Sequence, residues 1–282
     1  MKKEIATKTR TNEILKKYNL IAKKGYGQNF IIEPKIVRKI ADYASDENGC
    51  VIEIGPGIGA LSEQLALRNK SLIAYEIDDN LIEVLNDTLS LYDNVQIINL
   101  DFLKCDLESL IKNLRKDFSR VVICANLPYY ITTPILFKIF ECVEQVDEVV
   151  VMMQKEVADR FCAKVSTKEY NALSVIAQSL YDIKIVMNIS KEIFNPKPSV
   201  ASCVVSFIGK KNKTYIEQKE FFDFVKACFK QRRKTLYNNL KEYYHDNDKA
   251  EQTILNSGLE LNIRAEALSL DSFKNLFERR VK

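Results

Sequence analysis

Residues 50–59 of this chain read Cys50-Val51-Ile52-Glu53-Ile54-Gly55-Pro56-Gly57-Ile58-Gly59. The first five form an apolar run typical of a buried strand, and the glycines follow without a break. Leucines at 61, 65 and 67 then begin a helical pattern. A strand, a glycine turn and a helix in this order are typical of nucleotide-binding domains, because glycines let a ligand approach the backbone. Three glycines alone are weak evidence, so the rest of the chain must support this interpretation.

The next three predicted strands also end in polar residues. The strand at 71–75 is followed by Glu76, an acid that can hold ribose hydroxyls. The strand at 94–100 is followed by Asp101, which can accept a hydrogen bond from an adenine amino group, and the strand at 120–125 by Asn126. Open α/β sheets bind ligands outside the carboxyl ends of their strands. At strand ends, Glu76 and Asp101 are expected to contact a ligand and no buried partner. The ordered series is much stronger evidence for a ligand site than the glycines alone.

The turn after the fourth strand is Asn126-Leu127-Pro128-Tyr129-Tyr130. An amide, a rigid proline and an aromatic ring suit an exocyclic amine on a flat base. The Asn126 oxygen and a nearby backbone carbonyl can accept both N–H hydrogens of such an amine, and Tyr129 can stack on the ring. An ordinary strand-to-helix turn, with Asn and Pro as turn formers, is the structural alternative.

Further strands are predicted at 146–153, 183–189 and 202–208, and the pattern after residue 210 is wholly helical. We therefore predict an α/β fold with a Rossmann-like seven-stranded sheet and a small all-helical C-terminal domain. The expected domains are an α/β domain over 1–209, with a basic N-terminal tail over 1–24, and a helical domain over 210–282. Within the second domain, Gln231–Lys234 is expected in the middle of a helix.

Charge and composition narrow the function classes. The 282 residues carry a net charge of +4, with eight Lys and Arg against two acids in residues 1–24 and sixteen against eleven in residues 209–282. Basic ends around an acidic middle favour a polyanionic partner, although solvated tails are the simpler explanation.

No apolar run approaches the length of a membrane span, and no signal-peptide core is present. Seven cysteines without a Cys-x-x-Cys pair indicate reduced core residues of a cytoplasmic protein. With His245 as the sole histidine, in a polar stretch, we expect no metal site and no histidine-based catalysis.

The chain resembles the small-subunit (16S) ribosomal RNA adenine N6-dimethyltransferases, a family of class I S-adenosylmethionine-dependent methyltransferases. The resemblance covers nearly the whole length. It is carried by the segments Gly27–Phe30, Ile52–Gly57, Asn126–Tyr129, Gln154–Ala158, Phe194–Ser202, Gln231–Leu236 and Arg264–Ser269. The last two favour this family over relatives that methylate large-subunit RNA and confer macrolide resistance. The chain departs from the family at Ile31, where Leu is expected, and at Ala201, where Asp is expected.

The resemblance implies that residues 1–209 are the catalytic domain and residues 210–282 the RNA-binding domain, and it implies a role for each matching residue. Asn29 and Ile31 close over the cofactor S-adenosylmethionine, and the Gly55 backbone meets its methionine part. Glu76 binds the ribose, Asp101 the adenine, and Asn126 lies beside the sulfonium. The expected catalytic and RNA-binding residues are Asn126, Leu127, Pro128, Tyr129 and Phe194, and Arg232, Arg233 and Lys234. For Phe194, packing in the core is an equally good interpretation.

The implied reaction adds methyl groups to N6 of two adjacent adenosines near the 3′ end of small-subunit ribosomal RNA. The partner would be the immature small subunit, and the protein is expected to be a monomer. A catalytically weak ribosome-assembly factor and a large-subunit methyltransferase remain alternatives. An NAD-dependent oxidoreductase would share the glycine turn and Glu76, but the chain offers no obvious catalytic acid for it.

Overall fold

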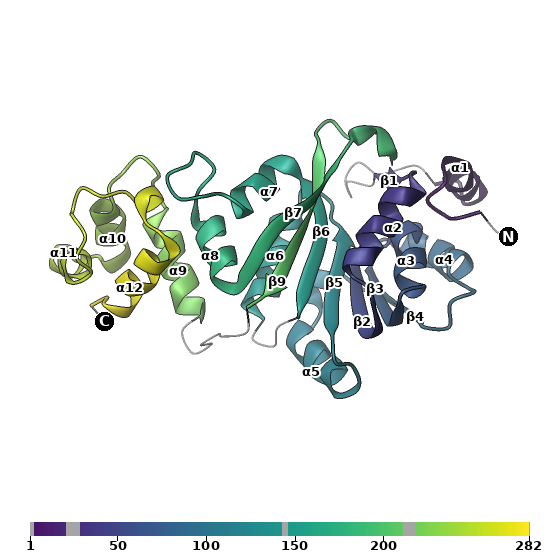
Figure 1. Cartoon of the computed structure of the whole chain (residues 1–282), viewed down its shortest axis with the longest axis horizontal. Helices are drawn as coiled ribbons and strands as arrows, with labels where there is room; N and C mark the ends of the chain where they lie inside the picture. The colour runs from purple at the N-terminus through teal and green to yellow at the C-terminus, as the bar shows by residue number, and fades with distance from the viewer. Residues whose placement is uncertain (1–2, 21–28, 143–145, 211–217, 282) are drawn as a thin grey trace. The chain divides into compact units, whose positions relative to one another are not determined.

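The computed structural model describes residues 3–20, 29–142, 146–210 and 218–281. By internal contacts the chain forms two compact units, one of residues 1–158 and 184–209, the other of residues 159–183 and 210–282. Figure 1 shows the helices and strands of both units.

The first unit is built on a seven-stranded sheet in the order β4-β3-β2-β5-β6-β9-β7. Strands β2 to β6 run parallel, and β9 runs antiparallel to β6. The predicted seven-stranded α/β sheet is confirmed. Its strands are β2 (Asp46–Ile54), β3 (Asn69–Glu76), β4 (Val95–Asn99), β5 (Val121–Asn126), β6 (Glu148–Gln154), β7 (Tyr181–Ile189) and β9 (Ser202–Gly209).

Helices connect the parallel strands. Both α3 and α4 pack against β3, and α5 packs against β5. The connecting helices are α3 (Ala60–Ala66), α4 (Asp79–Thr88), α5 (Leu107–Asp117) and α6 (Thr132–Glu141). Helix α2 (Pro34–Tyr43) precedes β2, and α7 (Lys155–Phe161) follows β6 and continues past residue 158, where the first stretch of the first unit ends. Short 3₁₀ turns lie at Phe102–Lys104 and Lys191–Ile193. A second sheet pairs β1 (Phe30–Ile31) with β8 (Phe194–Asn195) in antiparallel register. Sequence patterns did not predict this sheet, because two-residue strands have no periodicity to detect.

The chain reverses direction across the sheet at β2. It passes from β2 to β3 and β4 on one side, then returns to β5 on the other. Such a switch point opens a crevice at the carboxyl ends of the strands. The parallel register aligns Ile54 with Tyr75 on one side and with Ala125 on the other. Gly55, Glu76 and Asn126, each one residue further on, therefore reach the same edge.

The basic segment expected to be a tail over residues 1–24 is a packed helix in the part that the structure describes, so the expectation of a tail is wrong there. Residues Lys8–Lys17 form α1, and the side chains of Ile5, Thr11 and Ile14 are buried. Ile5 and Ile14 pack into the hydrophobic core of the first unit, which explains why the segment is ordered as a helix.

The second unit is helical but begins earlier than expected. Its elements are α8 (Ala172–Leu180), α9 (Gln218–Cys228), α10 (Leu236–Tyr244), α11 (Asn247–Asn256), a 3₁₀ turn (Ala265–Ala267) and α12 (Leu270–Glu278). The expected boundary between residues 209 and 210 assigned residues 159–183 to the first domain, but they belong to the second unit. Helix α8 packs against α9 and α12, and the Tyr170 hydroxyl donates to the Leu268 carbonyl at 2.9 Å. Tyr170 and Leu268 are 98 residues apart in the chain, a separation across which periodicity reveals nothing.

Candidate functional site

A cavity lies at the carboxyl edge of the sheet, at the switch point. It brings together β1, the glycine turn after β2, the end of β3 and the turn after β5. Its lining residues include Asn29, Ile31, Glu53, Gly55, Gly57, Glu76, Asn126, Leu127, Pro128, Tyr129 and Tyr130. Eight residues predicted to bind the cofactor or the target base thus meet in one place. Gly27 and Gln28, which carry part of the family resemblance, lie outside the described residues.

The glycine turn has a backbone that other residues rarely adopt. Gly55 and Gly57 have φ angles of +68° and +62°. A Cβ atom added at Gly55 would meet nothing within 4 Å, so the backbone there is open to a ligand. This local conformation follows from the sequence, because glycine alone takes it without strain.

Glu76 holds the glycine turn in addition to facing the cavity. Its Oε2 accepts a hydrogen bond from Gly57 N–H at 3.1 Å, and its Oε1 accepts one from Asp78 N–H at 2.9 Å. The side chain is buried. Burial raises the pKa of Glu76, while the hydrogen bonds from the backbone of Asp78 and Gly57 act in the opposite direction. The expectation that Glu76 has no buried partner is wrong.

Glu53 is a cavity residue to which sequence patterns assigned no role. It lies in β2 with only 1% of its surface exposed, and its Oε2 has no hydrogen-bond partner among the described residues. Burial raises the pKa of Glu53 to about 8, opposed by the nearby Ser62 hydroxyl and reinforced by the charge of Glu76. The sequence could have indicated this residue, because Glu53 is an acid inside an otherwise apolar strand and acids are rarely fully buried without a partner.

The turn after β5 is held by contacts from three parts of the first unit. Leu127 N–H donates to the Met152 carbonyl at 3.1 Å, and the Tyr129 hydroxyl lies 2.7 Å from Ser202 Oγ. The Asn126 amide nitrogen donates to the Asn29 carbonyl at 3.3 Å. This bond orients the amide, so that Oδ1 is the atom left to accept. Within the described residues, the Leu127 carbonyl oxygen accepts no hydrogen bond.

Two predicted site residues do not line the cavity. Asp101 follows β4, and its Oδ1 accepts a hydrogen bond from Leu103 N–H at 2.9 Å, which caps a short 3₁₀ turn. Phe194 lies in β8 with its side chain buried in the hydrophobic core. Its position favours the core-packing interpretation over a stacking surface.

The predicted RNA-binding residues lie in the second unit, and their expected helical setting is wrong. Helix α9 ends at Cys228 and α10 begins at Leu236, so Arg232, Arg233 and Lys234 occupy the turn between them. The side chain of Asn239 holds this turn, because its Oδ1 accepts from Gln231 N–H at 2.9 Å and its Nδ2 donates to the Cys228 carbonyl at 2.9 Å.

The three cations of the turn have different surroundings. Arg232 donates to the Lys168 carbonyl and forms an ion pair of 3.5 Å with Glu266. The acid that pairs with Arg232 belongs to the same unit. Arg233 and Lys234 are exposed and have no ion pair among the residues that the structure describes.

The described residues include no group of His, Cys, Asp or Glu placed to hold a metal ion. They also include no helix long and apolar enough to cross a membrane. The seven cysteines are free thiols, and all except the half-buried Cys162 are buried.

The sheet order, the glycine turn and the acid and amide at the strand ends define a Rossmann-like methyltransferase. Comparison with known proteins gives the family. The profile of the ribosomal RNA adenine dimethylase family matches residues 19–282, and the chain belongs to this family.

Individual relatives agree with this assignment. The chain is 46% identical to ribosomal RNA small subunit methyltransferase A of Bacillus licheniformis, over 99% of this chain and 98% of the relative. It is 44% identical to the protein of the same name from Enterococcus faecalis, over 97% and 95% of the two chains.

A solved structure supports the fold. The crystal structure of a dimethyladenosine transferase from Plasmodium falciparum superimposes with a TM-score of 0.73 at 24% identity, over 87% of this chain and 95% of that chain.

Proposed function

We propose that this protein transfers methyl groups from S-adenosylmethionine to N6 of adenosines in small-subunit ribosomal RNA, giving N6,N6-dimethyladenosine. The proposed targets are two adjacent adenosines near the 3′ end, in the immature small subunit. Family membership supports the reaction class. We further propose that the protein acts in the cytoplasm and as a monomer.

The cavity residues fit the proposed cofactor. The open backbone at Gly55 suits the close approach of a ligand, and the Glu76 carboxylate can accept from ribose hydroxyls. The unpartnered, buried Oε2 of Glu53 is a polar atom that a ligand with hydrogen-bond donors would satisfy. When bound, S-adenosylmethionine supplies a methyl group on a positively charged sulfur. The reaction therefore needs no protein nucleophile.

The observation that carries the proposal is the orientation of Asn126. Its amide nitrogen donates to the Asn29 carbonyl, which leaves Oδ1 as an acceptor beside the unused carbonyl of Leu127. These two oxygens can accept the two hydrogens of an adenine amino group. Accepting both favours a pyramidal nitrogen whose lone pair is available for attack. Two fixed acceptors of this kind lower the barrier through positioning and electrostatics, by an amount on the order of several kcal/mol.

The target base must leave its stack to reach these oxygens. Tyr129 lines the cavity and is the proposed stacking partner, and its hydroxyl contact with Ser202 fixes the ring. Asp101 is proposed to bind the cofactor adenine through its second carboxylate oxygen. Arg233 and Lys234 are proposed to contact RNA phosphates, while Arg232 holds the turn that presents them.

The test uses small subunits from cells that lack the protein. Mass spectrometry of their RNA is expected to show unmodified adenosine where wild-type RNA has dimethyladenosine. Adding purified protein and S-adenosylmethionine to these subunits should restore the modification, and the Asn126→Ala variant should not. Dimethyladenosine that persists in the deletion strain would refute the proposal.

A further inference from the structure

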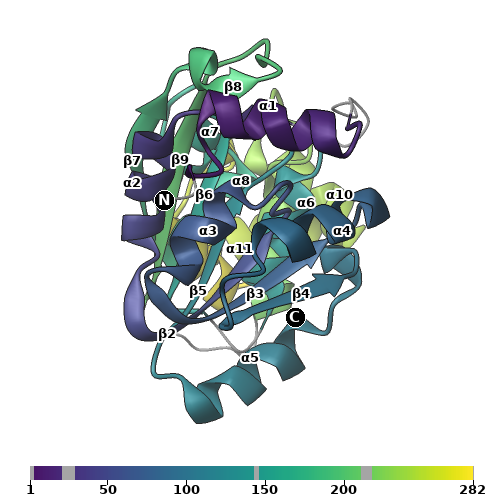
Figure 2. The same ribbon diagram turned by 90° about the vertical axis from the view of Figure 1, so that its right-hand side faces the viewer.

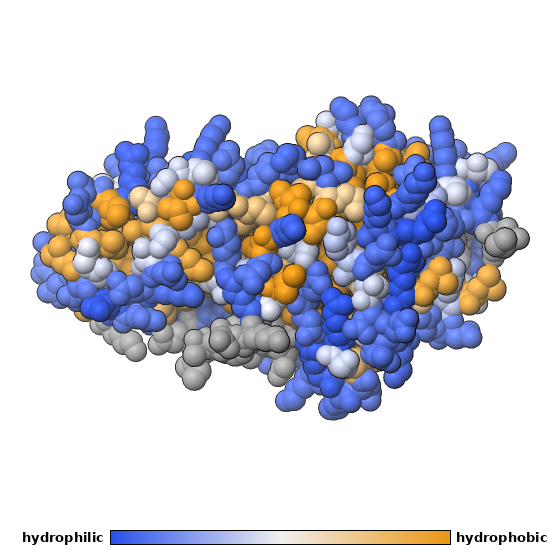
Figure 3. Space-filling model, viewed as in Figure 1, coloured by the Kyte–Doolittle hydropathy of each residue, from blue (hydrophilic) through white to orange (hydrophobic). Residues whose placement is uncertain are grey.

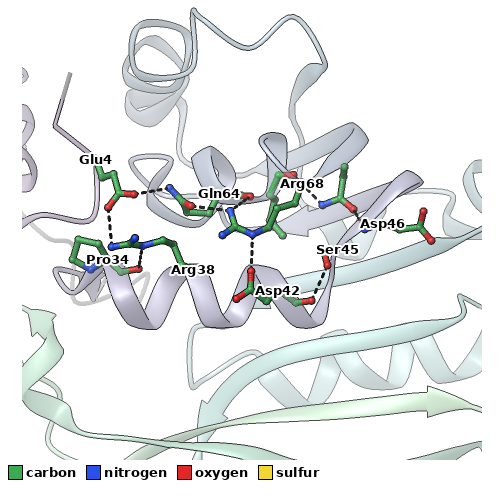
Figure 4. Close-up of polar contacts among 10 residues, drawn as sticks. Glu4, Pro34, Arg38, Asp42, Ser45, Asp46, Gln64 and Arg68 are labelled. Carbon is green, nitrogen blue, oxygen red and sulfur yellow. Dashed lines mark hydrogen bonds and ion pairs between the residues drawn. The ribbon is translucent and has the colours of Figure 1, made fainter. Parts of the chain in front are cut away.

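Helix α1 lies outside the part of the chain that the family profile matches, which begins at residue 19. Its segment is nevertheless firmly attached to the first unit. Ile5 N–H donates to Glu63 Oε2 of α3 at 3.0 Å, and the Thr11 hydroxyl donates to the Ile5 carbonyl at 2.9 Å. Figure 4 shows Glu4 reaching Arg38 of α2 and Gln64 of α3. Helix α1 is thus a fixed part of the surface of the first unit.

The basic residues of α1 divide into two groups by helical position. Residues advance by about 100° each, so Lys8, Asn12 and Lys16 fall within about 80° of one another and form one stripe, which the buried Thr11 borders. Lys17 and Arg10 lie on the other side, where they pair with Asp87 at 2.8 Å and Glu13 at 3.3 Å. The stripe formed by Lys8, Asn12 and Lys16 contains no acid. Its two lysines are exposed, with no ion pair in the described part of the chain.

The middle residue of this stripe contacts the segment that borders the cavity. Asn195 Nδ2 donates to Asn12 Oδ1 at 3.2 Å, and Asn195 is the register partner of Phe30 in the small sheet. Phe30 lines the cavity. Figure 2 shows α1 beside β8, and Figure 3 shows hydrophilic residues over α1. The stripe is therefore joined through Asn195 to the rim of the site.

We propose that the stripe of Lys8, Asn12 and Lys16 contacts the phosphate backbone of RNA flanking the target adenosine. The inference rests on the proposed function, since the partner is the same RNA. Two exposed ammonium groups with no ion pair among the described residues, on a rigid helix joined to the rim of the cavity, suit a polyanion that must present one base at that cavity. An ordinary solvated helix face would have the same lysines but no effect on RNA binding.

The experiment compares Lys8→Gln/Lys16→Gln with Lys17→Gln, measuring affinity for a 3′-terminal small-subunit RNA fragment at several salt concentrations. Lys17 is the matched control, because it adjoins Lys16 in sequence but lies about 100° further round the helix, outside the stripe, and pairs with Asp87. The double variant should flatten the slope of log affinity against log salt by about 1.4–1.8, which is roughly 0.7–0.9 per contact. Lys17→Gln should keep the wild-type slope. The affinity for S-adenosylmethionine should stay unchanged in both variants. The melting temperature should change little in either, because the Lys17–Asp87 ion pair is exposed and such pairs contribute little to stability.

Other outcomes separate the two proposals. A wild-type slope in the double variant would overturn the inference, and so would an equal effect of Lys17→Gln. A lower melting temperature together with weaker cofactor binding would show that the lysines only stabilise the fold, which also overturns it. If wild-type protein binds the RNA but never methylates adenosine, the proposed function fails while the RNA-binding role of the stripe can still be measured.

Discussion

Glu76 Oε2 accepts a hydrogen bond from Gly57 N–H at 3.1 Å, so the acid at the end of β3 closes the glycine turn that follows β2. Two neighbouring strands are tied together at the ligand edge by one side chain. The same carboxylate is proposed to bind ribose. Ligand binding and the shape of the turn are therefore coupled through Glu76.

We expect Glu76→Ala to weaken both cofactor binding and folding. The substitution removes the proposed ribose acceptor and leaves two backbone N–H groups without their partner. Each such loss typically costs about 1–3 kcal/mol. Calorimetric titration with S-adenosylmethionine and thermal unfolding would measure the two effects. Asp79→Ala, at the exposed start of α4, is the control. Wild-type cofactor affinity in Glu76→Ala would rule out the ribose assignment.

Asp101→Ala should weaken cofactor binding with a smaller effect on folding. The side chain caps only a three-residue 3₁₀ turn through one hydrogen bond, from Leu103. The loss of a charge-assisted hydrogen bond to the cofactor adenine would cost about 1.5–3 kcal/mol of binding. The same titration measures it. An unchanged dissociation constant would mean that the adenine lies elsewhere, consistent with the absence of Asp101 from the cavity lining.

Asn126→Ala should nearly abolish methyl transfer and retain most of the RNA affinity. It removes one of the two acceptors for the adenine amino group, whereas the proposed phosphate contacts lie on other elements. Single-turnover assays with saturating RNA would measure the chemical step. Asn113→Ala, on the exposed side of α5, should behave like wild type. A rate near the normal value in Asn126→Ala would show that the proposed activation of N6 is wrong.

The raised pKa of Glu53 predicts a particular pH dependence of the free energy of unfolding. Its pKa is raised in the folded protein to about 8, above the ordinary value of 4.5, so the folded state binds the proton more tightly than the unfolded state. The contribution of Glu53 to the free energy of unfolding should therefore be largest below about pH 4.5, and it should decline as the pH rises to about 8. The full effect is on the order of 4–5 kcal/mol. Denaturant unfolding between pH 5 and 8 should show a flatter profile for Glu53→Gln. Equal slopes for both proteins would contradict the assignment.

Arg233→Gln should weaken RNA binding alone, whereas Arg232→Gln should also loosen the turn. Arg232 contacts Glu266 and the Lys168 carbonyl, but Arg233 has no ion pair among the described residues. Arg233→Gln should lower the salt slope by roughly 0.7–0.9 at an unchanged melting temperature. Arg232→Gln should lower the melting temperature as well. If neither variant alters RNA affinity, the turn does not contact the substrate.

The sequence by itself determined the sheet and most of the cavity. A run such as Cys50–Ile54 is a strand because its residues are apolar, and Gly55 makes a turn because of its own backbone freedom. Parallel strands end at one edge, so the order of residues along the chain is enough to place Glu76 and Asn126 together. These properties depend on single residues or on neighbours in the chain.

Only the tertiary structure decided the remaining features. The tail proved to be α1 because Ile5 and Ile14 find a core made by distant residues, and the turn at Arg232 exists because Asn239 holds it from the next helix. The burial of Phe194, the unpartnered oxygen of Glu53 and the membership of residues 159–183 in the helical unit also depend on contacts across the chain. Local pattern carries no record of such contacts, because each depends on partners that folding alone brings within a few ångströms.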